Sequence, residues 1–123
     1  MDIKLFNEKD LAWYEHYNIQ IFLKESFIES RSFLYKDFAE KRPDQRIIAF
    51  KNGMIVAHVA IFMNVIIDED ITRKTYVGLG LMSCKQSLNI NRVAFIMYKR
   101  CLDHVLTLGY TYAIAISNHQ TII

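Results

Sequence analysis

The sequence is poor in the residues and runs that mark several common classes of protein. Its 123 residues include one proline and four glycines, without repeats or low-complexity segments, so the sequence predicts no flexible linker between domains. No apolar run approaches the roughly 20 residues that span a bilayer. The first residues also lack the charged-then-apolar pattern of a signal peptide. We therefore expect a single domain over residues 1–123, located in the cytoplasm.

An excess of charge of one sign is also missing. The formal net charge is +2, so the sequence predicts neither a nucleic-acid nor a membrane partner. The two cysteines, Cys84 and Cys101, are expected to be reduced thiols in the core, and no metal site is predicted. Apolar residues are plentiful: 52% of the chain is hydrophobic and 13% aromatic, which suits one well-filled core.

The C-terminal part of the chain reads as a strand, a polar loop, a long helix and a second strand. Residues 75–84 are apolar and β-branched, residues 85–92 are polar, and residues 110–117 are apolar throughout. Between them, residues 93–108 carry apolar side chains at helical spacing and stop at Gly109. Two buried strands joined by a helix of that length are expected to be parallel neighbours with a right-handed crossover.

Two more helices and an early strand are expected in the N-terminal part. Residues 3–6 alternate as in a short strand, and Asn7 is a favourable cap for a helix with Leu11, Tyr14, Tyr17, Ile21 and Phe22 on one side. A shorter helix is expected around residues 33–38. Aromatic residues crowd the stretch from Trp13 to Phe38, which indicates either core packing or a lining for an apolar acyl chain.

An antiparallel hairpin is predicted in the middle of the chain. Residues 46–51 and 54–63 are apolar runs on either side of Asn52 and Gly53, and Asn-Gly suits a two-residue turn with positive φ. The second run is apolar on both faces and is expected in mid-sheet. The charged residues 68–74 are expected to form a solvated hairpin loop. The fold class is therefore α+β: a mixed sheet, mostly antiparallel, with one parallel strand pair joined by a helix.

This order of elements resembles the Gcn5-related N-acetyltransferase (GNAT) superfamily. Within it, residues 55–60, residues 77–82 and the pair Met97-Tyr98 look like the rhizobial nodulation N-acyltransferases, which transfer a fatty acyl group to the amine of a chito-oligosaccharide. The resemblance implies acetyl-CoA or a longer acyl-CoA as donor substrate, an amine as acceptor and no metal. The family pattern continues into a further helix, with a tyrosine that can protonate the thiolate, and further strands; this sequence ends at Ile123.

The resemblance also implies which residues bind the donor. Backbone groups of Met82, Ser83 and Cys84 match the strand end that bonds the pantetheine arm. The phosphate-cradling loop matches Asn89, Ile90, Asn91, Arg92, Val93 and Ala94, and Asn118 matches an asparagine often found after the last strand. The usual loop glycines are replaced, so Arg92 is expected to meet a phosphate with its side chain. The alternative is a helix cap at Asn91 followed by a solvated Arg92.

His58 is the candidate catalytic base, because histidine titrates near neutral pH. The alternative for a lone histidine on an apolar strand is a hydrogen-bonded core residue. Two functions stay open: an acyl-CoA-dependent N-acyltransferase, or a non-catalytic domain of the same fold that homodimerises through its C-terminal sheet edge.

Overall fold

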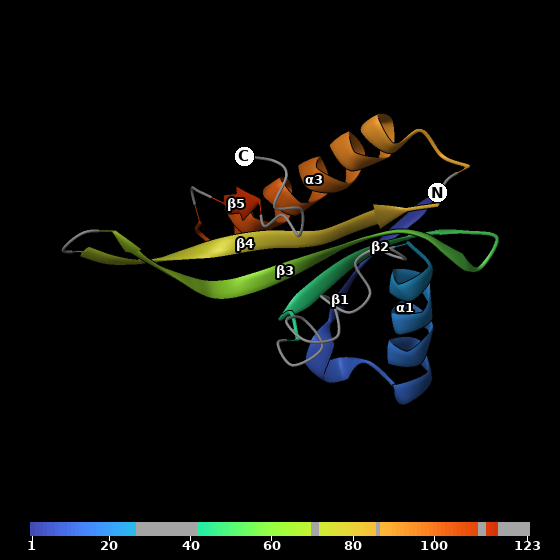
Figure 1. Ribbon diagram of the computed structural model, residues 1–123, viewed down its shortest axis with the longest axis horizontal. Helices are drawn as coiled ribbons and strands as arrows, with labels where there is room; N and C mark the ends of the chain where they lie inside the picture. The colour runs from blue at the N-terminus through green and yellow to red at the C-terminus, as the bar shows by residue number, and fades with distance from the viewer. Residues whose placement is uncertain (27–41, 70–71, 86, 111–112, 116–123) are drawn as a thin grey trace.

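The computed structural model describes residues 1–26, 42–69, 72–85, 87–110 and 113–115. Its centre is a five-stranded sheet with the strand order β1-β2-β3-β4-β5. One helix lies against each face of this sheet (Figure 1). The elements are β1 (Asp2–Asn7), the short helix η1 (Glu8–Asp10), α1 (Trp13–Ser26), β2 (Gln45–Lys51), β3 (Met54–Glu69), β4 (Thr72–Cys84), α3 (Ile90–Thr107) and β5 (Ala113–Ala115).

The strand pairing confirms the predicted fold class. The first four strands pair antiparallel in chain order, and β5 pairs parallel with β4 through Val77↔Ala113, Gly78↔Ile114 and Leu79↔Ala115. The run predicted for mid-sheet is β3, which pairs with β2 on one side and β4 on the other. Its two faces are apolar because both are covered, as the sequence pattern indicated.

Two clusters of buried side chains lie on opposite faces of the sheet. On one face, α3 packs Val93, Met97, Cys101 and Val105 against residues of β2, β3 and β4. On the other face, α1 packs Ile19, Phe22 and Leu23 against Ile48, Ala60 and Leu81. The helical spacing of the α3 residues was visible in the sequence, and the structure confirms it except at Leu108, which is exposed.

The predicted β2–β3 turn is confirmed, and the β3–β4 hairpin is longer than predicted. Asn52 (φ 54°) and Gly53 (φ 76°) form the two-residue turn with positive φ. β3 continues past a bulge at Asn64 (φ 57°) to Glu69, and β4 starts at Thr72, so most of the expected charged loop is strand. Figure 1 shows this hairpin projecting beyond the other strands. Three β-branched residues, 65–67, favour the extension over a loop.

Helix α3 begins at Ile90 rather than Val93 because its cap is Asn89, not Asn91. The Asn89 side chain accepts a hydrogen bond from the backbone N–H of Arg92 at 3.2 Å. At the other end, Gly109 (φ 92°) donates to the carbonyl of Leu106 and Tyr110 donates to the carbonyl of Val105. This pair of bonds is a Schellman motif, which confirms the predicted stop at Gly109.

Helix α1 begins later than predicted, and only part of the predicted side is packed: Phe22 is buried and Leu11 packs against the same cluster. Asn7 ends β1, and η1 intervenes before α1 begins at Trp13. The start of α1 is fixed by Glu15, whose carboxylate accepts from the Ala12 N–H at 2.9 Å. Tyr14 and Tyr17, predicted on the packed side, are more than half exposed. The helix predicted around residues 33–38 lies outside the described residues.

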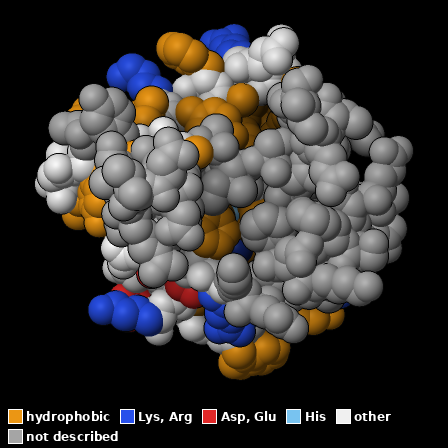
Figure 2. All heavy atoms as spheres, turned by 60° about the vertical axis from the view of Figure 1, so that its left-hand side comes forward, with side chains coloured by type: hydrophobic (Ala, Val, Ile, Leu, Met, Phe, Trp, Pro, Cys, Tyr) orange, Lys and Arg blue, Asp and Glu red, His pale blue; other side chains and the backbone are white. Residues whose placement is uncertain are grey.

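The described surface carries mixed charge. In the face shown in Figure 2, Lys and Arg side chains of the described residues lie apart from one another rather than in one patch. No helix among these residues is long and apolar enough to cross a membrane.

Candidate functional site

The carboxyl half of β4 contains a bulge. The pairing of β3 with β4 shifts between His58↔Ser83 and Ala60↔Gly80, so Leu81 and Met82 oppose the single residue Val59. Leu81 has φ 53°, a left-handed conformation that is uncommon for a residue with a branched side chain. Its side chain is buried in the α1-side cluster. Strain of this kind persists only where the surrounding structure holds it, and it concentrates at functional sites.

A buried chain of polar contacts reaches this bulge from the end of β1. Arg46 of β2 donates from Nε to Glu8 Oε2 at 2.6 Å and from Nη2 to Glu8 Oε1 at 3.1 Å. Its Nη1 lies 3.1 Å from His58 Nε2, and His58 Nδ1 lies 3.1 Å from the carbonyl oxygen of Leu81. Arg46 is 2% exposed and His58 0%. We call Glu8, Arg46, His58 and the Leu81 carbonyl the relay.

The chemistry of its partners settles the tautomer of His58. A guanidinium can only donate, so Nε2 must accept from Arg46; a carbonyl can only accept, so Nδ1 must carry the proton. Burial, followed by the nearby Arg46 charge, lowers the pKa of His58 to about 3. As placed, His58 offers no free lone pair to a substrate amine. The predicted role as general base does not fit this geometry, and the alternative of a hydrogen-bonded core histidine does.

The predicted donor-binding residues of β4 begin within the bulge, at Met82, and continue to Cys84. Met82 and Cys84 are half-buried against the α3-side core, whereas Ser83 is 4% exposed and pairs with His58 across the ladder. The Ser83 hydroxyl has no hydrogen-bond partner among the described residues. A buried hydroxyl without a partner is uncommon in a folded protein. The thiols are unlike activated nucleophiles, because burial raises the pKa of Cys84 and raises that of Cys101 to about 12.

The described pairing between β4 and β5 ends at Leu79↔Ala115, although β4 continues to Cys84. Within the described part of the chain, the edge of β4 from Gly80 to Cys84 is therefore not paired by β5. Such an edge can bond an extended amide-containing ligand through its main chain. Ser117 and Asn118, which the sequence placed at the end of the second strand, lie outside the described residues.

The predicted phosphate loop forms the first turn of α3. Asn89 is the cap, Ile90 and Asn91 are exposed, and Arg92 is exposed one position further on. Val93 is buried in the core and cannot contact a ligand with its side chain, while Ala94 is half-buried. The first turn holds no acidic residue. An α-helix leaves its first N–H groups without partners inside the helix, and here those of Arg92 and Val93 bond to Asn89. The Arg92 side chain and the N–H groups of Ile90 and Asn91 suit an anion.

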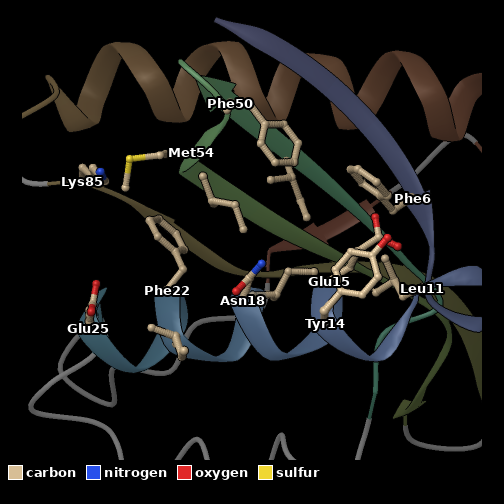
Figure 3. A pocket seen from close by; sticks show the side chains of 15 residues that line it. Phe6, Leu11, Tyr14, Glu15, Asn18, Phe22, Glu25, Phe50, Met54 and Lys85 are labelled. Carbon is tan, nitrogen blue, oxygen red and sulfur yellow. The ribbon is translucent and has the colours of Figure 1, made fainter.

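A pocket of about 420 Å³ lies between α1 and the sheet. Figure 3 shows Asn18 and Phe22 of α1 facing Phe50 and Met54 across it. Its walls are mainly apolar and include Phe6, Leu11, Ile19, Ile48 and Ile55, with Glu15, Glu25 and Lys85 among the lining residues. Ile19, Phe22 and Ile48 also pack in the cluster that contains Leu81, although Leu81 itself does not line the pocket. Of the predicted crowd of aromatic residues, Phe22 packs in the core and lines the pocket, and Tyr14 lines it, whereas Trp13 and Tyr17 are exposed; the members from Phe27 to Phe38 lie outside the described residues.

Sequence reasoning missed three parts of this site. Leu81 carries no signal for a left-handed conformation, because that conformation follows from the strand register. Arg46 and Glu8 lie 38 positions apart, and each looked like an ordinary surface charge. The available signal was weak: an arginine directly before the apolar run 47–50 and a histidine at the centre of the next strand.

Comparisons with known proteins support the fold. No family model matches the sequence, and no curated protein matches it. Among solved structures, Escherichia coli ElaA has a TM-score of 0.63 at 16% identity, over 84% of this chain and 68% of that one. An acyl-CoA N-acyltransferase from Pseudomonas aeruginosa has a TM-score of 0.67 at 15% identity, over 87% and 71%. A predicted acetyltransferase from Clostridium acetobutylicum, solved with acetyl-CoA, has a TM-score of 0.56 at 17% identity, over 94% and 80%. The chain has the GNAT-like α+β fold that the element order predicted.

Proposed function

We propose that this protein is an acyl-CoA-dependent N-acyltransferase. The observation that carries the proposal is the strained bulge at Leu81 in β4, whose described parallel pairing with β5 ends at Leu79↔Ala115, just before the bulge. Two further observations support it: the cationic first turn of α3, and the fold shared with an acyl-CoA N-acyltransferase and with a structure holding acetyl-CoA. The donor thioester would lie along the β4 edge, with its phosphates at Arg92.

The reaction is the attack of a neutral amine on the thioester carbonyl carbon. A C–N bond forms, the C–S bond breaks, and the departing thiolate takes up the proton that the amine loses. Charge develops on the carbonyl oxygen before the C–S bond breaks. Backbone N–H groups at a bulge are fixed donors, so they can stabilise that charge without reorganising during the reaction. The pantetheine amides would bond the main chain of β4 between Gly80 and Cys84.

Replacing Arg92 with alanine tests the phosphate end of this site. We expect acetyl-CoA binding to weaken about tenfold, which corresponds to the loss of one charge-assisted hydrogen bond of about 1.5 kcal/mol. Titration calorimetry measures it. Arg100→Ala, an exposed arginine further along α3, is the matched control and should leave the affinity unchanged. Acetyl-pantetheine lacks the phosphates, so its affinity should not respond to Arg92→Ala; an equal loss for both ligands would contradict this placement.

The apolar pocket extends the proposal to the acyl group, in line with the resemblance to nodulation N-acyltransferases. Its volume of about 420 Å³ lies within the range of small-molecule sites, and its walls are mainly apolar. The proposal places the acyl chain in this pocket, whose lining residues Ile19, Phe22 and Ile48 also pack in the cluster that contains Leu81. The proposed donor is therefore an acyl-CoA longer than acetyl-CoA.

Blocking the pocket should separate long donors from short ones. Asn18 faces into the pocket from α1 (Figure 3), and Asn18→Trp should raise KM for octanoyl-CoA about tenfold while leaving KM for acetyl-CoA unchanged. Tyr17→Trp adds a tryptophan at a neighbouring exposed position that does not line the pocket, and it should change neither the KM for octanoyl-CoA nor the KM for acetyl-CoA. A rise in KM for the amine alone would assign the pocket to the acceptor instead.

Self-association is the second candidate function, as a non-catalytic module of the same fold. It is favoured by exposed apolar side chains on the outer side of α3, where Phe95 is 70% and Leu106 59% exposed. Among the described residues, β5 is also the edge strand of the sheet. Sedimentation at micromolar concentration would show a homodimer if this candidate is right and a monomer if it is not.

A further inference from the structure

The proposed reaction needs a bulge that keeps one shape. We infer that His58 is a positioning residue that holds the Leu81–Met82 peptide, and that Arg46 and Glu8 orient the His58 ring. This inference rests on the proposed function and adds the residues that prepare its backbone donors. It assigns His58 no contact with substrate.

The hold of His58 on the bulge is direct. Its Nδ1–H donates to the Leu81 carbonyl at 3.1 Å, inside a fully buried environment. A trans peptide is planar, so fixing this carbonyl also fixes the direction of the Met82 N–H. Leu81 would otherwise favour φ below zero, and a hydrogen bond to its carbonyl restricts ψ, so the bond limits the conformations that this residue can adopt.

The remainder of the relay fixes His58 in turn. Only a neutral ring with its proton on Nδ1 can both accept from Arg46 and donate to Leu81. Arg46 is oriented by two bonds to the Glu8 carboxylate, which holds the planar guanidinium in one direction. Each link thus determines the orientation of the next, from η1 to the bulge. Among the described residues, Glu8 Oε1 also lies 4.0 Å from Nε of Arg42 and 3.5 Å from Nε2 of His16, whose pKa is lowered mainly by burial.

Two substitutions at His58 separate its two contacts. The amide nitrogen of asparagine takes about the place of Nδ1, so His58→Asn keeps a donor for the Leu81 carbonyl and loses the contact with Arg46. The longer glutamine reaches about the place of Nε2, so His58→Gln keeps the Arg46 contact and loses the Leu81 bond. Both variants remove the same ring from the same buried position, so a purely structural role predicts similar effects.

We expect kcat with an acyl-CoA donor to fall about 10- to 100-fold in His58→Gln, because misplaced donors lose transition-state stabilisation. In His58→Asn, kcat should fall no more than about threefold, with KM for the donor little changed in either variant. NMR shifts and three-bond couplings of Leu81 should report the left-handed conformation in wild type and His58→Asn, and its loss in His58→Gln. Equal kcat values in the two variants, or a left-handed Leu81 in both, would overturn the inference.

Two readouts keep this test decisive. If wild-type protein transfers no acyl group, the proposed function fails, and the Leu81 comparison alone decides whether His58 holds the bulge. If either variant does not fold, the imidazole nitrogen shifts of His58 in the folded wild-type protein decide whether His58 can hold the bulge. Protonated Nδ1 with unprotonated Nε2 supports the relay, and the opposite tautomer overturns it because Nδ1 could not donate to Leu81.

Discussion

Replacing Arg46 with leucine is expected to lower the free energy of unfolding by about 3–5 kcal/mol, as when one partner of a buried ion pair is removed. The guanidinium is 2% exposed, and the Glu8 carboxylate that it binds is 9% exposed. Without Arg46, Glu8 loses two short hydrogen bonds and His58 loses the donor to Nε2. Urea denaturation of wild type and variant at neutral pH measures the loss.

Arg42 supplies the matched control for this prediction. Its Nε lies 4.0 Å from the same Glu8 carboxylate, but its side chain is 62% exposed. Exposed ion pairs contribute roughly 0–1 kcal/mol, so Arg42→Leu should change stability little. A loss in Arg46→Leu no larger than in Arg42→Leu would show that the relay is not a tightly held buried network.

Acid is expected to destabilise the wild-type protein strongly because of His58. Its pKa is about 3 in the folded state, against 6.5 as its ordinary value, so between these pH values the unfolded state binds more protons. Stability is therefore lost as pH falls from about 6.5 toward 3. The loss from this one group is about 2 kcal/mol by pH 5 and approaches about 5 kcal/mol near pH 3. Unfolding free energies measured from pH 7 to pH 4.5 test it.

His58→Asn isolates the contribution of His58 to the pH dependence of stability, because asparagine does not titrate and the carboxylates are common to both proteins. The variant should be less stable than wild type at pH 7 but should lose less stability on acidification. His16, whose pKa is also lowered, mainly by burial, adds a loss of the same sign in both proteins and cancels in the comparison. Parallel pH dependence in wild type and variant would mean that His58 is not held neutral in the fold.

Local signals in the sequence were enough to predict most of the strands, the β2–β3 turn and the long helix α3. Asn52 and Gly53 determine the β2–β3 turn because few residues adopt positive φ, and the spacing of Val93, Met97, Cys101 and Val105 identifies the buried side of α3. The parallel pair followed from two apolar strands joined by a long helix. The start of α1 was mispredicted because Glu15 caps it from inside the helix, a signal that competes with the capping preference of Asn7.

The candidate site was less predictable because its geometry depends on contacts between distant residues. His58 was singled out correctly as unusual, but its partners Arg46 and Leu81 become neighbours only when three strands pair in one register. Register cannot be read from apolar alternation alone once both faces of the strands are apolar. The choice between a base and a core histidine required those partners.

An NMR titration of the amide resonances with acetyl-CoA can show whether an acyl-CoA binds along β4 with its phosphates at the start of α3. We expect saturable shifts centred on Met82, Ser83 and Cys84 and on the first turn of α3 at Ile90, Asn91 and Arg92. Spectra unchanged at millimolar acetyl-CoA, or shifts confined to other elements, would contradict it.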